Sequence, residues 1–160
     1  MEDPVAPQGE KIGGWLVLPL LGLIISPFVI LYNLYNEVWD GFAEGYLSTL
    51  VAPFSQHFDG KWAALIYFIL FGSLTRLGLC AAALWLFLKK SRRTPVFVIC
   101  WLVYGVFYLA VRENLWNRIP ELAKQPNPDF LKSFFRAVLQ VAIWTPYFLT
   151  ADRAKHTFVE

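Results

Sequence analysis

Four long apolar runs dominate this chain, and they constrain its fold more than any other feature. They cover residues 15–35, 62–88, 95–111 and 131–150. A helix needs roughly 20 residues to cross the hydrocarbon core of a bilayer, and roughly 17 to 25 are tolerated. The runs must be helices, because lipid offers the backbone no hydrogen-bond partners and four strands cannot close a barrel. The sequence therefore predicts one all-α membrane domain, residues 1–160, built as a four-transmembrane-helix bundle.

Composition supports a lipid environment. Apolar residues of the AVILMFWYC set make up 57% of the chain, and charged residues make up 16%, whereas soluble domains are nearer 25% charged. A small domain leaves much of its surface exposed and cannot hide this excess from water. We therefore expect the lipid bilayer as the principal partner. The net charge of +2 is too weak to indicate a nucleic-acid partner.

The distribution of Lys and Arg predicts the orientation of the chain. With four crossings, seven basic residues fall on the side of the two termini and five on the other. Four of the seven crowd into the turn 89–94, where the positive-inside rule is strongest. We therefore expect both termini in the cytoplasm. The seven are Lys11, Lys89, Lys90, Arg92, Arg93, Arg153 and Lys155, and the five are Lys61, Arg112, Arg118, Lys124 and Lys132.

The outer loop between the first two runs, residues 36–60, carries apolar residues at a spacing of four. This period is typical of one face of a helix, although Gly41, Gly45 and Pro53 interrupt it. We expect a partly helical loop that covers the bundle or meets a partner. The stripe consists of Val38, Phe42, Tyr46, Leu50 and Phe54.

Arg76 is the most informative single residue, because it lies near the middle of the second apolar run. A charge at the bilayer centre costs roughly 2.5–3.5 kcal/mol on insertion scales, and the four runs contain no Asp or Glu. Ser26, Tyr104 and Gln140 lie at similar depth in the other runs. We predict that they form a buried polar cluster around Arg76. Pro27 adds a further acceptor, because it leaves the carbonyl of Leu23 without its helical donor.

Three interpretations of this cluster remain open. Polar groups between membrane helices commonly lock their packing. Alternatively, the guanidinium of Arg76 binds an anion or a lipid phosphate, groups onto which arginine forks well. In a third interpretation, a partner subunit supplies the counter-ion. Arg136, near the outer end of the fourth run, is interpreted as an anchor that snorkels to the headgroups.

No sequence motif indicates an enzyme. The His, Cys and carboxylate residues show no metal-ligand spacing, and neither a phosphate loop nor a nucleophile beside a base is present. Cys80 and Cys100 lie within apolar runs and are expected to act as small hydrophobic residues. We therefore expect no catalytic residues, no metal and no cofactor.

Two stretches resemble the beginning and end of a known family. The first, residues 12–19, contains Gly13, Gly14 and Trp15, and the second begins at residue 143. The second contains Trp144, Pro146, Tyr147, Arg153, Lys155, Thr157 and Phe158. Together they resemble domain of unknown function 2569 (the YdgK-like proteins), small bacterial four-span inner-membrane proteins. Residues 150–152 and Ala154 depart mildly from the family pattern. The resemblance implies a bacterial inner-membrane location and four helices, and it carries over no activity.

Physical reasons account for the closing stretch. Trp144 and Tyr147 approach the inner interface, and Pro146 is expected to bend the last turns of its helix. Arg153 and Lys155 then satisfy the positive-inside rule. We expect Thr157 and Phe158 to fold back onto the membrane surface.

Two functions follow as hypotheses. The first is a non-enzymatic accessory or scaffold component of a larger membrane complex, associated with a partner membrane protein or with further copies of itself. The alternative is a small transporter or an anionic-ligand or lipid-binding protein that uses Arg76, Tyr104 and Gln140.

Overall fold

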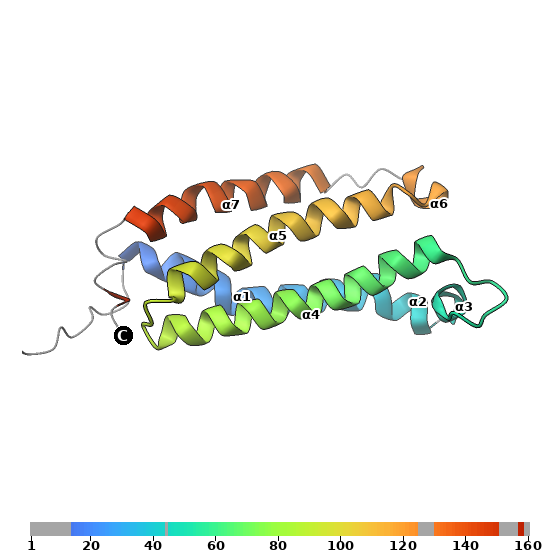
Figure 1. Cartoon of the computed structure of the whole chain (residues 1–160), viewed down its shortest axis with the longest axis horizontal. Coiled ribbons are helices and arrows are strands. Elements are labelled where there is room, and N and C mark those ends of the chain that lie inside the picture. Colours follow the sequence, from blue (N-terminus) through green and yellow to red (C-terminus); the bar gives the residue numbers. More distant parts are fainter. Residues whose placement is uncertain (1–13, 44, 125–129, 151–156, 159–160) are drawn as a thin grey trace, which may run out of the picture.

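The computed structural model describes residues 14–43, 45–124, 130–150 and 157–158, and the regular elements in these ranges are helices. Four long helices lie along the same axis of the molecule (Figure 1). They are α1 (Val17–Leu34), α4 (Gly60–Leu88), α5 (Thr94–Trp116) and α7 (Phe130–Thr150). The shorter elements are η1 (Gly14–Leu16), a π-helical turn η2 (Tyr35–Trp39), α2 (Asp40–Ala43), α3 (Tyr46–Val51) and α6 (Pro120–Ala123).

Three of the described segments are long and apolar enough to cross a membrane. They are Gly14–Trp39, Gly60–Leu88 and Thr94–Trp116. The third continues beyond the predicted end at Val111, so Arg112 lies within α5 rather than in a loop. The fourth predicted crossing coincides with α7, which is 21 residues long but is not among these three. All-helical architecture is thus confirmed, and the fourth crossing stays a prediction.

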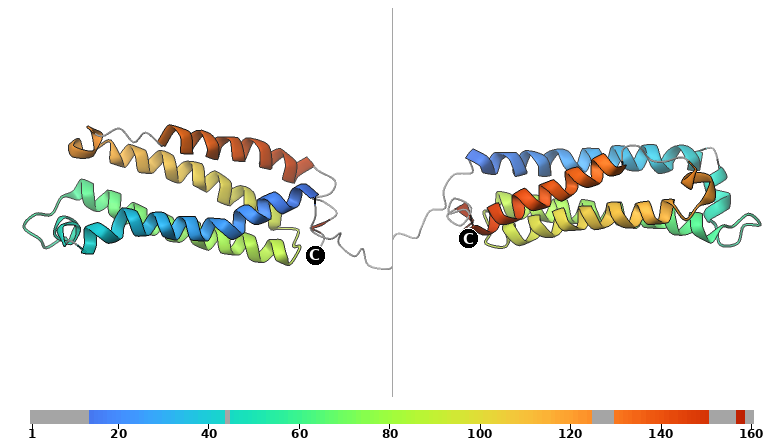
Figure 2. Two further views of the ribbon diagram at one scale, coloured as in Figure 1. Left: turned by 180° about the vertical axis from the view of Figure 1, so that it is seen from behind. Right: turned by 90° about the horizontal axis from the view of Figure 1, so that it is seen from above.

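The helices do not pack evenly around a common axis. α4 packs against both α1 and α5, and α7 packs against α5. Leu16 beside α1 and Phe148 on α7 share one hydrophobic cluster at the end of the molecule where α1 begins. In Figure 1 the two helices draw apart toward the other end, whereas in the view from above α7 runs obliquely from over α5 toward α1 (Figure 2, right). The bundle is therefore closed between α4 and its neighbours and open between α1 and α7.

The two ends of the molecule differ. One end, which we call the termini end, contains the start of α1, the basic turn that joins α4 to α5, and Phe158. The short helices α2, α3 and α6 lie at the other, which we call the loop end (Figure 1). This arrangement places the described ends of the chain beside the basic turn, as the sequence predicts.

A tight C-terminal cap on α4 makes this basic turn. Lys90 has a left-handed backbone (φ 54°). The backbone N–H groups of Ser91 and Lys90 donate to the carbonyls of Leu86 and Phe87, both at 3.1 Å. These two bonds form the Schellman motif, and the hydroxyl of Thr94 also donates to the carbonyl of Leu86 at 2.8 Å. The turn therefore satisfies the last carbonyls of α4 while reversing the chain into α5.

The loop after α1 is partly helical, as predicted, but its predicted single apolar stripe is wrong. Gly45 adopts φ 81°, which interrupts the helix and changes its phase before α3. The side chains that α3 buries are consequently Leu47 and Val51, which pack with residues of the first turns of α4. Phe54, the last member of the predicted stripe, is fully exposed.

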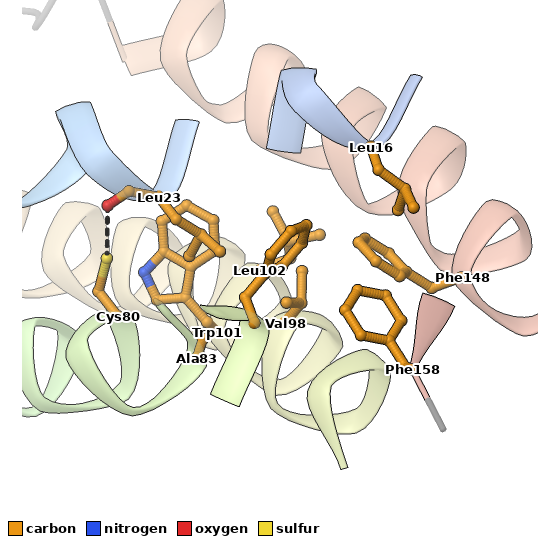
Figure 3. Close-up of a cluster of buried hydrophobic side chains, with 10 residues drawn as sticks. Leu16, Leu23, Cys80, Ala83, Val98, Trp101, Leu102, Phe148 and Phe158 are labelled. Carbon is orange, nitrogen blue, oxygen red and sulfur yellow. Dashed lines mark hydrogen bonds between the residues drawn. The ribbon is translucent and has the colours of Figure 1, made fainter. Parts of the chain in front are cut away.

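Thr157 and Phe158 of the closing stretch are buried rather than spread on the membrane surface. Thr157 is 0% exposed and Phe158 is 5% exposed. The ring of Phe158 packs edge-on against Phe87 of α4 at 5.1 Å between centroids and lies 6.3 Å from Phe148 of α7 (Figure 3). The expectation of a surface location is therefore wrong, because the gap between α4 and α7 at the termini end accepts an aromatic ring.

Glycine and two tyrosines define the seam between α4 and α5. A Cβ atom on Gly72 would lie 2.7 Å from the ring of Tyr108. The hydroxyl of Tyr104 donates to the carbonyl of Gly72 at 3.2 Å, and the Tyr108 and Ser73 hydroxyls are hydrogen-bonded at 3.2 Å. Small residues that let helices approach closely are typical of membrane interfaces. Gly72 is therefore required for this close contact.

We predict that Gly72→Ala lowers the free energy of unfolding by about 1–3 kcal/mol, the usual cost of overpacking. The matched control is Gly78→Ala on the same helix, where an added Cβ meets nothing within 4 Å. It should be neutral or stabilising by up to about 1 kcal/mol, because Ala is the better helix former. Unfolding in mixed micelles of a mild detergent and SDS measures both. Equal effects of the two substitutions would contradict the tight seam.

Candidate functional site: a cavity between α1, α5 and α7

A cavity of about 490 Å³ occupies the open side of the bundle, between α1, α5 and α7, and Arg76 of α4 reaches it. Three arginines and no carboxylate line it in the part of the chain that the structure describes. Its polar lining includes Ser26, Arg76, Arg112, Ser133, Arg136 and Gln140. The cavity therefore has a positive character in the middle of an apolar molecule.

The polar wall of this cavity comes from one face of α7. Ser133, Arg136, Gln140 and Trp144 follow one another at spacings of three or four residues and all line the cavity. Residues three and four apart share a face of a helix. Because α7 packs on α5 rather than on α1, this face has no helix directly against it over most of its length.

Arg76 points from the middle of α4 into this space. Sixteen residues of α4 precede it and twelve follow, or about 24 Å and 18 Å of helix. Its guanidinium carbon lies 6.0 Å from the centre of the Tyr108 ring, at the limit of a cation–π contact. The guanidinium also lies next to Gly105, where an added Cβ would meet Nη2 at 3.8 Å, an ordinary van der Waals contact.

Two buried donors at the cavity lack hydrogen-bond partners among the described residues, Arg76 Nε and the indole Nε1 of Trp101. Figure 3 shows this indole nitrogen on the side of the ring that faces Cys80, one helical turn from Arg76. No described carboxylate lies within ion-pair distance of Arg76. Buried polar groups are normally hydrogen-bonded, so this pair of donors is unusual.

The structure brings three of the four predicted cluster residues to one cavity. Ser26, Arg76 and Gln140 line it, although Gln140 is exposed and the other two are half-buried rather than buried as predicted. Tyr104 does not line it, because its hydroxyl is bonded to Gly72 within the α4–α5 seam. Ser26 donates its hydroxyl to the carbonyl of Gly22 at 2.6 Å, and this bond leaves its oxygen able only to accept.

The carbonyl that Pro27 frees is also accounted for. The thiol of Cys80 donates to the Leu23 carbonyl at 3.3 Å (Figure 3). This bond ties α4 to α1 one turn beyond Arg76. The acceptor expected from the sequence therefore exists, but a neighbouring residue of α4 uses it and Arg76 does not.

A smaller cavity of about 290 Å³ adjoins the first toward the loop end and shares Asn33, Leu109, Arg112 and Ser133 with it. Glu37 lines the smaller cavity and forms an ion pair with Arg112, with 3.0 Å between Oε1 and Nη1. The two cavities thus make one furrow, with an ion pair where they meet.

Sequence reasoning missed this ion pair, and it missed that Arg136 faces the cavity. The hydrophobic pattern places Arg112 after the third span, but α5 continues to Trp116. The same pattern places Glu37 in the loop, but the π-helical turn η2 extends the first helix past it. The sequence feature that could have indicated this pair is that Glu37 and Arg112 both lie within about two helical turns of an apolar run. Trp101 carries no sequence signal as a donor, because tryptophan is common in membrane helices.

The residues of the two family-like stretches have structural positions. Gly14 adopts φ 60° at the start of the first helix, a conformation that favours glycine. Trp15 is 70% exposed. Trp144 packs edge-on against Tyr147 at 5.6 Å, and Pro146 lies within α7. Gly13, Arg153 and Lys155 lie outside the described residues.

These features define a helical membrane protein with a basic cavity. The chain belongs to the family described as protein of unknown function (DUF2569), whose model matches residues 9–159. It is 29% identical over 156 residues to the inner membrane protein YdgK of Escherichia coli (strain K12), and the match covers 94% of each chain. No solved structure matches it significantly.

We predict that Glu37 and Arg112 are energetically coupled. In a double-mutant cycle with Glu37→Gln and Arg112→Gln, the coupling should be about 0.5–3 kcal/mol, as for residues in contact. The control cycle pairs Arg112→Gln with Glu113→Gln, since Glu113 lines the same small cavity without pairing with Arg112. Unfolding in mixed micelles measures both cycles. Equal coupling in the two cycles would contradict a specific Glu37–Arg112 pair.

Proposed function

We propose that this membrane protein binds an anionic, phosphate-bearing ligand in the cavity between α1, α5 and α7. The observation that carries the proposal is Arg76, a half-buried cation that lines the cavity, with a buried Nε that has no partner among the described residues and no described carboxylate at ion-pair distance. Burying a charge is costly unless it is paired, and a bound anion would pair it. Arginine presents a planar fork that matches phosphate oxygens.

The other basic residues of the cavity support the same charge preference. Arg112 is already paired with Glu37, whereas Arg136 lines the cavity with no described carboxylate at ion-pair distance. Two guanidinium groups without a described carboxylate partner, Arg76 on α4 and Arg136 on α7, therefore favour an anion over a cation. The unpartnered Trp101 Nε1 adds a neutral donor suited to a phosphate oxygen.

We predict that Arg76→Gln weakens binding of a phosphate-bearing probe by about tenfold or more, since a hydrogen bond to a charged group contributes about 1.5–3 kcal/mol and 1.4 kcal/mol is tenfold. The probes are phosphatidylglycerol, with phosphatidylcholine as the zwitterionic reference, and inorganic phosphate. Binding is measured on delipidated protein by the rise of its thermal midpoint with probe concentration.

Two further variants make this result interpretable. Arg93→Gln removes one charge from the basic turn, away from the cavity, and should bind as the wild type does. Arg76→Lys keeps the charge without the fork and should be intermediate, which separates a binding defect from a folding defect. If neither probe distinguishes Arg76→Gln from Arg93→Gln, the proposed site is wrong.

The proposal includes a fourth crossing by α7, with both termini in the cytoplasm of a bacterial inner membrane. Its polar residues Ser133, Arg136 and Gln140 line the cavity, and another exposed face of the helix is apolar at helical spacing: Leu131, Phe135, Leu139 and Ile143. An exposed face that is apolar suits lipid rather than water. The inner-membrane relative and the basic turn beside the described ends of the chain support the location and the orientation.

We predict that a membrane-impermeant maleimide labels a cysteine at Asn117 in intact spheroplasts but labels neither one at Ser91 nor one appended after Glu160. Cys80 and Cys100 are first replaced by Ser. Permeabilised cells provide the control, because all three sites should then react. Labelling of the appended cysteine together with Asn117 would show that α7 does not cross.

The accessory or scaffold role stays a prediction, as does the expectation that the chain is not an enzyme. Anion binding takes precedence because a basic cavity is a specific observation. Small size and missing catalytic motifs are shared by many membrane proteins. Recovery of a stoichiometric partner in mild detergent would support the accessory role.

A further inference from the structure

The two walls of the large cavity differ in chemistry. The α7 wall presents Ser133, Arg136 and Gln140, whereas the α1 wall is mainly apolar, with Leu18, Ile25 and Val29 among its members. Polar groups alone would be sufficient to bind a small inorganic anion. A cavity with one polar wall and one apolar wall instead matches a molecule that has a charged group and a hydrocarbon part.

The cavity also opens toward lipid. Ile25 and Val29 line it and yet are 56% and 49% exposed, so they form part of its rim. They lie on α1, which shares a hydrophobic cluster with α7 near the termini end and does not have α7 as a main packing neighbour. In a bilayer, an exposed apolar rim between two transmembrane helices borders acyl chains.

The polar groups form a path that reaches Arg76 from the loop end. Glu37 and Arg112 stand where the two cavities adjoin, and Arg136 and then Arg76 lie in the larger one. Beyond Arg76, toward the termini end, the cavity continues between apolar side chains such as Leu18, Val98 and Trp144. The charged groups therefore lie between the loop end and the middle of the molecule, and the apolar part of the cavity lies beyond them.

We propose that the ligand is an anionic phospholipid of the leaflet on the loop side, which enters sideways between α1 and α7. Its phosphate binds the guanidinium of Arg76, and an acyl chain lies along the apolar wall of α1. This inference rests on the proposed anion site. It adds that the anion is attached to a hydrocarbon chain, so that the headgroup is drawn below its usual depth.

Gly22 offers a direct test, because it lies on the apolar wall and an added Cβ there meets nothing within 4 Å. Gly22→Leu should fill the space for the chain without a clash. Gly78→Leu is the matched control, since Gly78 is also exposed and has open space, but does not line the cavity. Gly22→Val is a smaller second variant in case the leucine disturbs folding.

The probes are phosphatidylglycerol and glycerol phosphate, which share a phosphate but differ in the acyl chains. The wild type should bind phosphatidylglycerol and show at least tenfold weaker response to glycerol phosphate. Gly22→Leu should weaken phosphatidylglycerol binding by about tenfold, with Gly22→Val intermediate and Gly78→Leu unchanged. Binding is measured by thermal midpoint and by retention of the lipid in native mass spectrometry.

The other outcomes are equally decisive. If glycerol phosphate binds as tightly as the lipid and Arg76→Gln abolishes both, the site takes a water-borne anion, and the lipid inference fails while the proposed function stands. If Gly22→Leu and Gly78→Leu behave alike, the chain does not lie on the α1 wall. If no probe depends on Arg76, both proposals fail together.

Discussion

The guanidinium of Arg76 is the physical constraint on which the rest of the structure depends. It sits halfway along a 29-residue apolar helix, where a charge is expensive in lipid. The protein does not bury it against a carboxylate in the described part of the chain. Instead, it lies beside Gly105 and 6.0 Å from the centre of the Tyr108 ring, and Arg76 lines a cavity while its buried Nε has no partner among the described residues. The fold therefore places the charge beside a cavity rather than against a described carboxylate.

Specific contacts of α4 explain why that space exists. Hydrogen bonds at Gly72 and Ser73 hold one side of α4 against α5. The hydrogen bond from Cys80 to the freed carbonyl of Leu23 holds another side of α4 against α1. α7 then has α5 as its main neighbour and diverges from α1 after the shared cluster at the termini end. The inward face of α7 can consequently stay polar, which is the reverse of a helix in a soluble bundle.

Much of the fold follows from the sequence, because a bilayer permits few architectures. Apolar runs predict the three confirmed membrane-capable helices, and Arg76 stands out as a lone charge. Depth along the helices also identifies Ser26 and Gln140 as cavity residues. Depth does not specify how a helix is rotated about its axis, however. A cluster predicted from depth alone therefore includes Tyr104, whose hydroxyl instead donates to the carbonyl of Gly72.

Other features depend on local backbone geometry that hydrophobic patterns do not encode. The left-handed Gly45 shifts the phase of α3, and the π-helical turn η2 carries Glu37 toward Arg112. Phe158 fills a gap whose shape depends on how α4 and α7 diverge. Each of these features depends on how the helices are placed in three dimensions. The spacing of residues in a single sequence does not predict that placement.

The most direct test of the central claim is a solid-state NMR measurement of ¹⁵N–³¹P dipolar dephasing between labelled arginine side chains and lipid phosphorus, in phosphatidylglycerol-containing bilayers. A charge-assisted N–H···O bond of about 2.8 Å from Arg76 to a lipid phosphate predicts a strongly dephased guanidinium signal. That component should be present in the wild type, absent in Arg76→Gln and retained in Arg93→Gln. If the wild type and Arg76→Gln differ no more than the wild type and Arg93→Gln, Arg76 does not bind a lipid phosphate.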